Sequence, residues 1–209
     1  MKTLDPVTHR IRREFILQQA RHLFAHHGFT ETSMDDIARI CRVQKASLYH
    51  YFESKQQILQ EMADLECAHW AAHLAAYEGG TDLRQTLSII AETFLKDMDQ
   101  PAHQEFFKII HFESHKNPAI QHALEQSPTQ NKAGFYAVFV RHLEGRLPRR
   151  RVAILVTQFM GALIHYASLT RLRKRSRFYE PFSDAEFVEQ LVNVFAQAPA
   201  ILNDPPVKQ

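Results

Sequence analysis

Apolar residues recur at helical spacing along almost the whole chain, and this pattern predicts an all-α protein of about nine helices. The first helix is expected from about Arg10 to His27, with one apolar face and with Gly28 behind it as a left-handed stop. No segment alternates apolar and polar residues over the length of a strand, and no internal repeat is visible. We therefore expect a fold without a sheet.

Two short helices joined by a tight turn are predicted within residues 29–52. The first begins at Ser33, whose hydroxyl can cap free backbone N–H groups, while Asp36 supplies the acidic half of a capping-box pair. The second spans roughly residues 44–51, with Leu48 as a buried anchor. This is the outline of a helix-turn-helix, whose second helix enters the major groove of DNA.

Further helices are predicted from residue 54 to the C-terminus. Their starts are marked by capping residues or by a leading proline, at Ser54 with Gln57, Thr81, Pro101, Asn117-Pro118 and Ser183 with Glu186. The helix after Pro118 is expected to break near Pro128, and residues 145–148 are expected to form a turn.

The last two predicted helices are apolar on more than one side. Apolar residues cover most of the circumference between Val152 and Leu169, and the helix after Ser183 has two adjoining apolar faces. One face can serve the core of the protomer and the other a partner, which predicts an intersubunit four-helix bundle. The alternative is that the protomer covers both faces itself. The predicted dimerisation residues are Leu155, Phe159, Leu163, Phe187, Leu191, Val194 and Phe195.

The first quarter of the chain contains a specific set of residues, namely Gly28-Phe29, Thr32-Ser33-Met34, Ile37-Ala38, Val43, Leu48-Tyr49-His50-Tyr51-Phe52 and Ser54-Lys55. With this set the chain resembles the tetracycline-repressor (TetR) family of transcription factors from about Ile16 to Leu59. The resemblance implies a homodimer with a DNA-binding domain in residues 1–55 and an effector-binding and dimerisation domain in residues 56–209. It also implies that a ligand in the larger domain releases the protein from double-stranded operator DNA, or less often permits binding, and that the usual role is repression. From the sequence itself we expect a cytoplasmic protein and a small hydrophobic or aromatic effector.

Two residues of the turn and the second short helix depart from the family pattern. Arg42 stands where glycine is common, so it is either in a strained positive-φ conformation or in an altered turn. Gln44 stands where serine or threonine usually caps the helix, and it can instead contact adenine. The first 60 residues contain nine bases and six acids, a modestly basic composition that suits phosphate binding. The predicted DNA-binding residues are Thr32, Ser33, Arg42, Gln44, Lys45, Ser47, Tyr49, His50 and Lys55.

Aromatic residues are frequent in the body of the chain, where an effector pocket is expected, because such pockets are mostly apolar with a few polar anchors. For any single residue, packing in the core is the alternative interpretation. The predicted ligand-binding residues are Trp70, His73, Tyr77, Phe94, Phe107, His111, Phe135, Phe139, Phe159 and Tyr166.

The composition narrows the remaining possibilities. The chain is 45% apolar and 23% charged with a net charge of +2, as in a globular protein, and no run is expected to cross a membrane. Two of the pairs among its 13 histidines, His69 with His73 and His111 with His115, are spaced for chelation, but no third ligand is evident, so neither metal nor cofactor is predicted. Cys41 and Cys67 lack metal or disulfide spacing, which fits a reduced cytoplasm. The sequence contains no recognisable enzyme motif. The alternatives to a DNA-binding regulator are a metalloenzyme that uses the histidines and a protein-binding adaptor.

Overall fold

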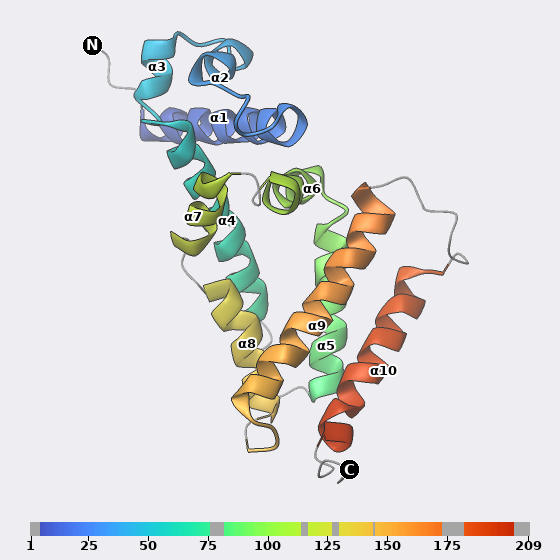
Figure 1. Ribbon diagram of the computed structural model, residues 1–209. Helices are drawn as coiled ribbons and strands as arrows, with labels where there is room; N and C mark the ends of the chain where they lie inside the picture. Colours follow the sequence, from blue (N-terminus) through green and yellow to red (C-terminus); the bar gives the residue numbers. More distant parts are fainter. Residues whose placement is uncertain are drawn as a thin grey trace. The chain divides into compact units, whose positions relative to one another are not determined.

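The computed structural model describes residues 5–75, 82–113, 117–126, 130–143, 145–172 and 182–202 (Figure 1). Side chains are described throughout these ranges except at residues 75, 112–113, 124–126, 130–135 and 198–202. All regular structure in these residues is helical, which confirms the predicted all-α class. The elements are α1 (Pro6–His27), α2 (Met34–Ile40), α3 (Lys45–Tyr49), α4 (Lys55–Ala75), α5 (Leu83–Asp97), α6 (Pro101–Lys108), η1 (Ile109–Glu113), α7 (Pro118–Gln126), α8 (Gln130–Leu143), α9 (Arg149–Ala167), η2 (Ser168–Leu172) and α10 (Asp184–Leu202).

Helix starts follow the predicted capping residues in most cases. Ser33 caps α2 in a reciprocal capping box, in which the Asp36 amide donates to the Ser33 hydroxyl over 3.2 Å and the Asp36 carboxylate accepts from the Ser33 amide over 3.0 Å. Ser183 and Glu186 form the same reciprocal pair at the start of α10. These local hydrogen bonds satisfy N–H groups that a helix cannot pair internally, which is why short-range sequence patterns predicted them.

The start of α5 differs from the prediction. Thr81 lies outside the described residues, and the N-cap is Asp82, whose carboxylate accepts from the Gln85 amide over 2.7 Å. Only one of the two hydrogen bonds of the expected capping box forms between Ser54 and Gln57. The Gln57 backbone amide donates to the Ser54 hydroxyl, but the Gln57 side-chain oxygen accepts from the Glu53 amide rather than from the Ser54 amide.

The chain forms two compact units, with residues 1–68 and 101–128 in unit 1 and residues 69–100 and 129–209 in unit 2. The predicted domain boundary between residues 55 and 56 falls inside unit 1. The reason is that η1 and α7 return to the core of the first helices, where Ile109, Ile120 and Ala123 are buried with residues of α1 to α4.

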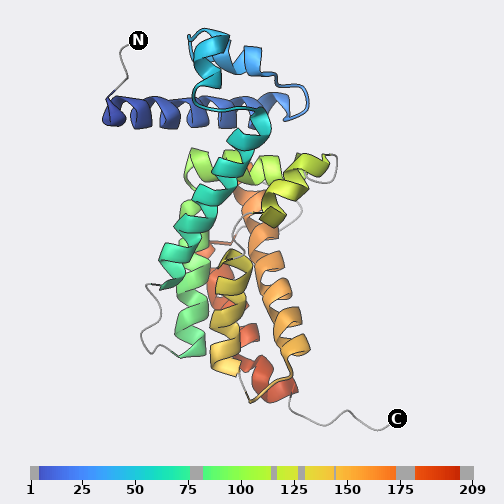
Figure 2. The ribbon, with the colours of Figure 1, turned by 90° about the vertical axis from the view of Figure 1, so that its left-hand side faces the viewer.

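Unit 1 is organised around α1. The helices α2 and α3 lie on one side of α1 and α6 lies on the opposite side (Figure 2). The buried face of α1 presents Ile16, Ala20 and Phe24, which pack in the same core as Leu48 of α3 and Phe52. Because all of these side chains lie in one core, the position of the short helix α3 is held by long-range packing rather than by its own length.

Unit 2 is a layered bundle in which α5 contacts α9 and α10, and α9 also contacts α8 and α10. Phe159 of α9 is fully buried, and it makes edge-on ring contacts with Phe139 of α8 (5.6 Å) and Phe195 of α10 (5.4 Å). The buried Thr86 hydroxyl of α5 lies 3.1 Å from His142 Nε2, so these two polar groups are paired with each other.

Most of the predicted dimerisation residues are used within the protomer. Leu155, Phe159, Leu163 and Leu191 are buried in the chain itself, so their assignment to a partner surface is corrected. Of the remaining three, Phe187 stacks on Tyr166 at 3.9 Å, Phe195 contacts Phe159, and Val194 is 64% exposed. The helical pattern identified two apolar faces but could not tell which one α5 and α8 cover. The exposed side of α9 instead carries Ile154, Thr157, Gln158, Gly161 and His165.

One segment of the described chain, Arg149–Leu172, is long and apolar enough to cross a membrane by length and composition alone. The expectation that no run reaches that length was therefore wrong. The α9 part of the segment contacts α5, α8 and α10 and buries one side against them. The protein buries 33% of the most apolar stretch of this segment, so packing accounts for part of its apolar composition.

Candidate nucleic-acid interface

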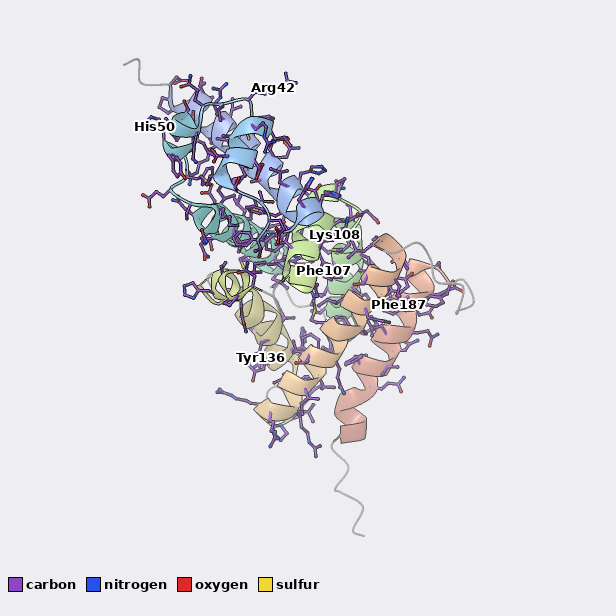
Figure 3. All side chains as sticks on the ribbon, turned by 45° about the horizontal axis from the view of Figure 1, so that its top comes forward. Arg42, His50, Phe107, Lys108, Tyr136 and Phe187 are labelled. Carbon is purple, nitrogen blue, oxygen red and sulfur yellow. The ribbon has the colours of Figure 1, made fainter. Side chains whose placement is uncertain are left out.

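The exposed side of α3 and the turn before it carry most of the side chains predicted to contact DNA. Leu48, on the inner side, is fully buried in the unit 1 core and determines which side of this five-residue helix faces outward. The outward side chains, called here the recognition surface, are those of Arg42, Gln44, Lys45, Tyr49 and His50. Arg42 and His50 lie at the outer edge of unit 1 (Figure 3). Ser47, also predicted to contact DNA, is half-buried beside them.

The turn between α2 and α3 has a left-handed residue, the first of the two alternatives given for Arg42. Arg42 has a φ of 53°, and it is the one non-glycine residue with positive φ in the described chain. The turn is closed by the Val43 amide, which donates to the Ala38 carbonyl over 3.0 Å. Because Cβ crowds the backbone in this conformation, Arg42 costs stability that a glycine would not.

Arg42→Gly is therefore expected to raise the free energy of unfolding by up to about 1 kcal/mol. Chemical denaturation followed by circular dichroism measures this change. Arg39→Gly is the matched control: Arg39 lies in the last turn of α2, and glycine there is expected to be destabilising. A destabilised Arg42→Gly variant would show that the arginine side chain makes a stabilising contact which outweighs the backbone strain.

Gln44 is the N-cap of α3 and has extended backbone angles, φ −68° and ψ 145°. Its side chain makes no capping hydrogen bond, as expected for a residue that caps poorly. The exposed amide is consequently not used by the helix start. A glutamine amide in this position has the donor and acceptor needed for a bidentate contact to adenine.

Lys45 pairs with Asp35 of α2 on the surface of the unit. The distance from Nζ to Oδ2 is 2.7 Å and both side chains are more than half exposed. The hydrogen bond to Asp35 and its negative charge raise the pKa of Lys45, so the ammonium group stays charged. Exposed pairs of this kind contribute little to stability, and Lys45 can therefore exchange Asp35 for a phosphate at little cost.

Lys55 does not lie on this surface, because contacts within the protein occupy its ammonium group, and its DNA contact stays a prediction. Its ammonium group donates to the backbone carbonyls of Phe29 (2.7 Å), Thr30 (3.0 Å) and Thr32 (2.9 Å), and it lies over the Phe29 ring. Burial lowers the pKa of Lys55. All three ammonium donors are used within the protein, so Lys55 holds the α1–α2 loop against the start of α4.

The hydroxyls of Thr32 and Ser33 are also occupied. Thr32 is buried and donates to the Gly28 carbonyl over 2.8 Å. Ser33 donates to the Asp36 carboxylate and accepts from the Asp36 amide. Both side chains stabilise the loop and the start of α2, and their role as hydrogen-bond donors to DNA stays a prediction.

The predicted ligand-binding residues divide between the two units. In unit 2, Trp70 lies 5.7 Å from Phe94 and 6.1 Å from His73 between ring centroids. In unit 1, Phe107 stacks on His111 at 3.7 Å, and burial lowers the pKa of this histidine. The structure does not describe Tyr77 or the side chain of Phe135.

Three further predicted ligand residues, Phe139, Phe159 and Tyr166, are buried in the packing of unit 2. Tyr166 donates to Asp184 over 2.7 Å, and burial together with this acceptor raises the pKa of Tyr166 to about 12. These three residues act as core residues, so the alternative interpretation given above applies to them.

The structure adds a carboxylate to one histidine pair. Asp97 Oδ2 lies 2.8 Å from His69 Nε2 and 3.9 Å from His73 Nε2, a neighbour that sequence spacing could not identify. His115 of the other pair lies outside the described residues.

Comparisons with known proteins agree with this geometry. Residues 16–62 match the model of the family described as bacterial regulatory proteins, tetR family. Over 49 residues the chain is 39% identical to the biofilm operon icaADBC HTH-type negative transcriptional regulator IcaR of Staphylococcus aureus, which covers 23% of this chain. Such alignments span 18% to 26% of the length of the curated relatives.

Similarity to solved structures extends over nearly the whole chain. GusR of Salmonella enterica matches with a TM-score of 0.67 at 20% identity, covering 97% of this chain and 98% of that one. AibR in complex with isovaleryl coenzyme A and operator DNA matches with a TM-score of 0.64 at 17% identity, covering 88% and 97%. At these identities the similarity shows the fold.

The exposed α3 on a three-helix core has the geometry of a helix-turn-helix. Through residues 16–62, the N-terminal part of the chain is similar to the tetR family of bacterial regulatory proteins.

Proposed function

We propose that the protein is a cytoplasmic, non-enzymatic transcriptional repressor that binds double-stranded operator DNA as a homodimer and is released by a small hydrophobic or aromatic effector. The observation that carries the proposal is the recognition surface, in which polar and basic side chains face outward from a helix anchored by Leu48. The family match covers the same residues and supports the assignment.

Within this surface the side chains have different roles. Gln44 and Lys45 lie at the start of α3, where side chains of a helix-turn-helix reach base edges. We assign Gln44 to a base contact and Lys45 to a contact with both base and phosphate. Tyr49 and His50, at its end, together with Ser47 and Arg42, are assigned to phosphate contacts, which set affinity and orientation without reading sequence. Phosphate contacts release counterions, so affinity should fall steeply with salt.

A homodimer would present this surface twice. We assign the partner contact to the exposed side of α9, where Ile154 is 49% exposed, and to Val194 of α10. Gly161 on the same side of α9 would allow close approach of a second helix, since a Cβ there would have no neighbour within 4 Å. Two-fold symmetry matches the symmetry of operator half-sites.

Support for an effector is less direct. AibR is described in complex with an acyl coenzyme A and operator DNA, and the present chain shares its fold. Trp70, His73 and Phe94 form an aromatic group in unit 2 whose partly exposed members are suited to an apolar ligand. We assign the effector contact to this group.

DNA binding is tested by fluorescence anisotropy with the DNA upstream of the protein's own gene. The wild type should bind with an affinity that falls with salt, and Lys45→Ala should weaken binding to all sequences and reduce the salt slope by about one. Gln44→Ala should instead change the preference among base substitutions in the operator. Lys96→Ala, an exposed cation on α5, is the control and should bind as the wild type does.

If the wild type, Lys45→Ala and Gln44→Ala bound DNA with the same affinity at every salt concentration, α3 would not be the element that reads DNA. For the effector, a thermal-shift screen of hydrophobic and aromatic metabolites should yield compounds that stabilise the folded protein by mass action and dissociate the DNA complex.

A further inference from the structure

A group of three potential metal ligands lies on unit 1, away from the recognition surface. His22 and His26 are one helical turn apart near the end of α1, and Glu105 comes from α6. Glu105 Oε1 lies 2.8 Å from His22 Nδ1 and 3.6 Å from His26 Nε2. All three ligand atoms lie within 4.8 Å of one another. The three side chains therefore converge on one point.

The distances fit a tetrahedral metal. With bonds of about 2.0–2.1 Å to nitrogen and oxygen, two ligands of a tetrahedral Zn²⁺ are about 3.3 Å apart. The distances from Glu105 Oε1 to His22 Nδ1 (2.8 Å) and to His26 Nε2 (3.6 Å) lie on either side of that value. Two imidazole nitrogens and one carboxylate oxygen are also the ligand types that Zn²⁺ and similar divalent metals accept.

The surroundings of Glu105 restrict the carboxylate. Its side chain is only 15% exposed, so α1 and α6 limit its rotamers and keep Oε1 beside the two histidines. Arg21 Nε lies 3.4 Å from Oε2 without a hydrogen bond, and its positive charge lowers the affinity for a cation.

A simple ion pair explains less of this arrangement. A nitrogen of each ring lies near the same carboxylate oxygen, and the ring centroids are 4.3 Å apart. A divalent ion accepts two imidazole nitrogens and a carboxylate oxygen at the same time.

We propose that His22, His26 and Glu105 bind one divalent transition-metal ion, with Zn²⁺ as the best fit and water in the fourth position. The two histidine side chains are 52% and 44% exposed, so the ion can enter from solvent. The bound metal would join α1 to α6 within unit 1 and stabilise the folded state of that unit by mass action. The proposal does not depend on DNA binding.

The test is equilibrium dialysis of the full chain, without a polyhistidine tag, against Zn²⁺. We expect one ion per chain in the wild type. In His26→Gln and Glu105→Gln the dissociation constant for Zn²⁺ should rise more than tenfold. Losing a residue that only supports a ligand costs about 10- to 100-fold in affinity, and losing a ligand itself should cost at least as much. Affinity should also fall as the pH is lowered, because protons compete for the imidazole nitrogens.

Two controls locate the ion. His27→Gln, an adjacent exposed histidine on the same helix, and the double variant His69→Gln/His73→Gln, in the second histidine and carboxylate group, should both bind Zn²⁺ as the wild type does. Absence of binding by the wild type at micromolar Zn²⁺ would overturn the proposal. Binding that persists in His26→Gln and is lost in the double variant would also overturn it.

Discussion

Replacing Phe159 with alanine is expected to lower the free energy of unfolding by about 3–5 kcal/mol. The side chain is fully buried between α8 and α10, where its ring contacts Phe139 and Phe195, and its removal leaves a cavity that these helices cannot close without moving. Urea denaturation monitored by circular dichroism gives the value directly.

Ile154→Ala is the matched control for this prediction. Ile154 lies on the same helix but is 49% exposed, so the loss of stability within the protomer should be well below that of Phe159→Ala. The same variant should weaken the homodimer, which sedimentation velocity measures. If Phe159→Ala were as stable as wild type but monomeric, Phe159 would face a partner after all and the assignment of α9 faces would be reversed.

Lys55→Met is expected to destabilise unit 1 by about 1–3 kcal/mol. Hydrogen bonds from a charged donor are each worth about 1.5–3 kcal/mol when buried, and partial exposure of Lys55 reduces their sum. Three carbonyls of the α1–α2 loop lose their shared donor, while methionine keeps most of the apolar volume. Thermal denaturation should show a lower midpoint.

The comparison with Lys45→Ala separates structural from DNA-binding lysines. Lys45→Ala should leave the midpoint nearly unchanged, because its pair with Asp35 is exposed, and should weaken DNA binding. Lys55→Met should lower the midpoint, and its folded form should bind DNA with the wild-type salt slope. A stable Lys55→Met protein with a flatter salt slope would restore the phosphate contact that the sequence suggested for Lys55.

These two lysines also show where prediction from the sequence ends. Both lie near helix starts in a basic region, and no local pattern distinguishes them. Lys55 is occupied because residues 23 to 26 positions earlier bring three carbonyls to its ammonium group. Lys45 is exposed because α3 turns Leu48 inward. The distinction depends on contacts between distant segments.

Interactions between residues a few positions apart were predictable. The capping boxes at Ser33 and Ser183, the positive φ of Arg42 and the uncapped side chain of Gln44 follow from backbone geometry that neighbouring residues control. The family resemblance added the function of α3, and the match over residues 16–62 agrees with it.

The sequence alone determined the all-helical class and the capping boxes at Ser33 and Ser183, because these depend on hydrogen bonds and side-chain spacing within about four residues. Only the tertiary structure decided that α6 and α7 join unit 1, that Phe159 belongs to the core, and that Glu105 meets His22 and His26. Those outcomes depend on which apolar faces pack together across long stretches of chain, and helical periodicity marks such faces without naming their partners.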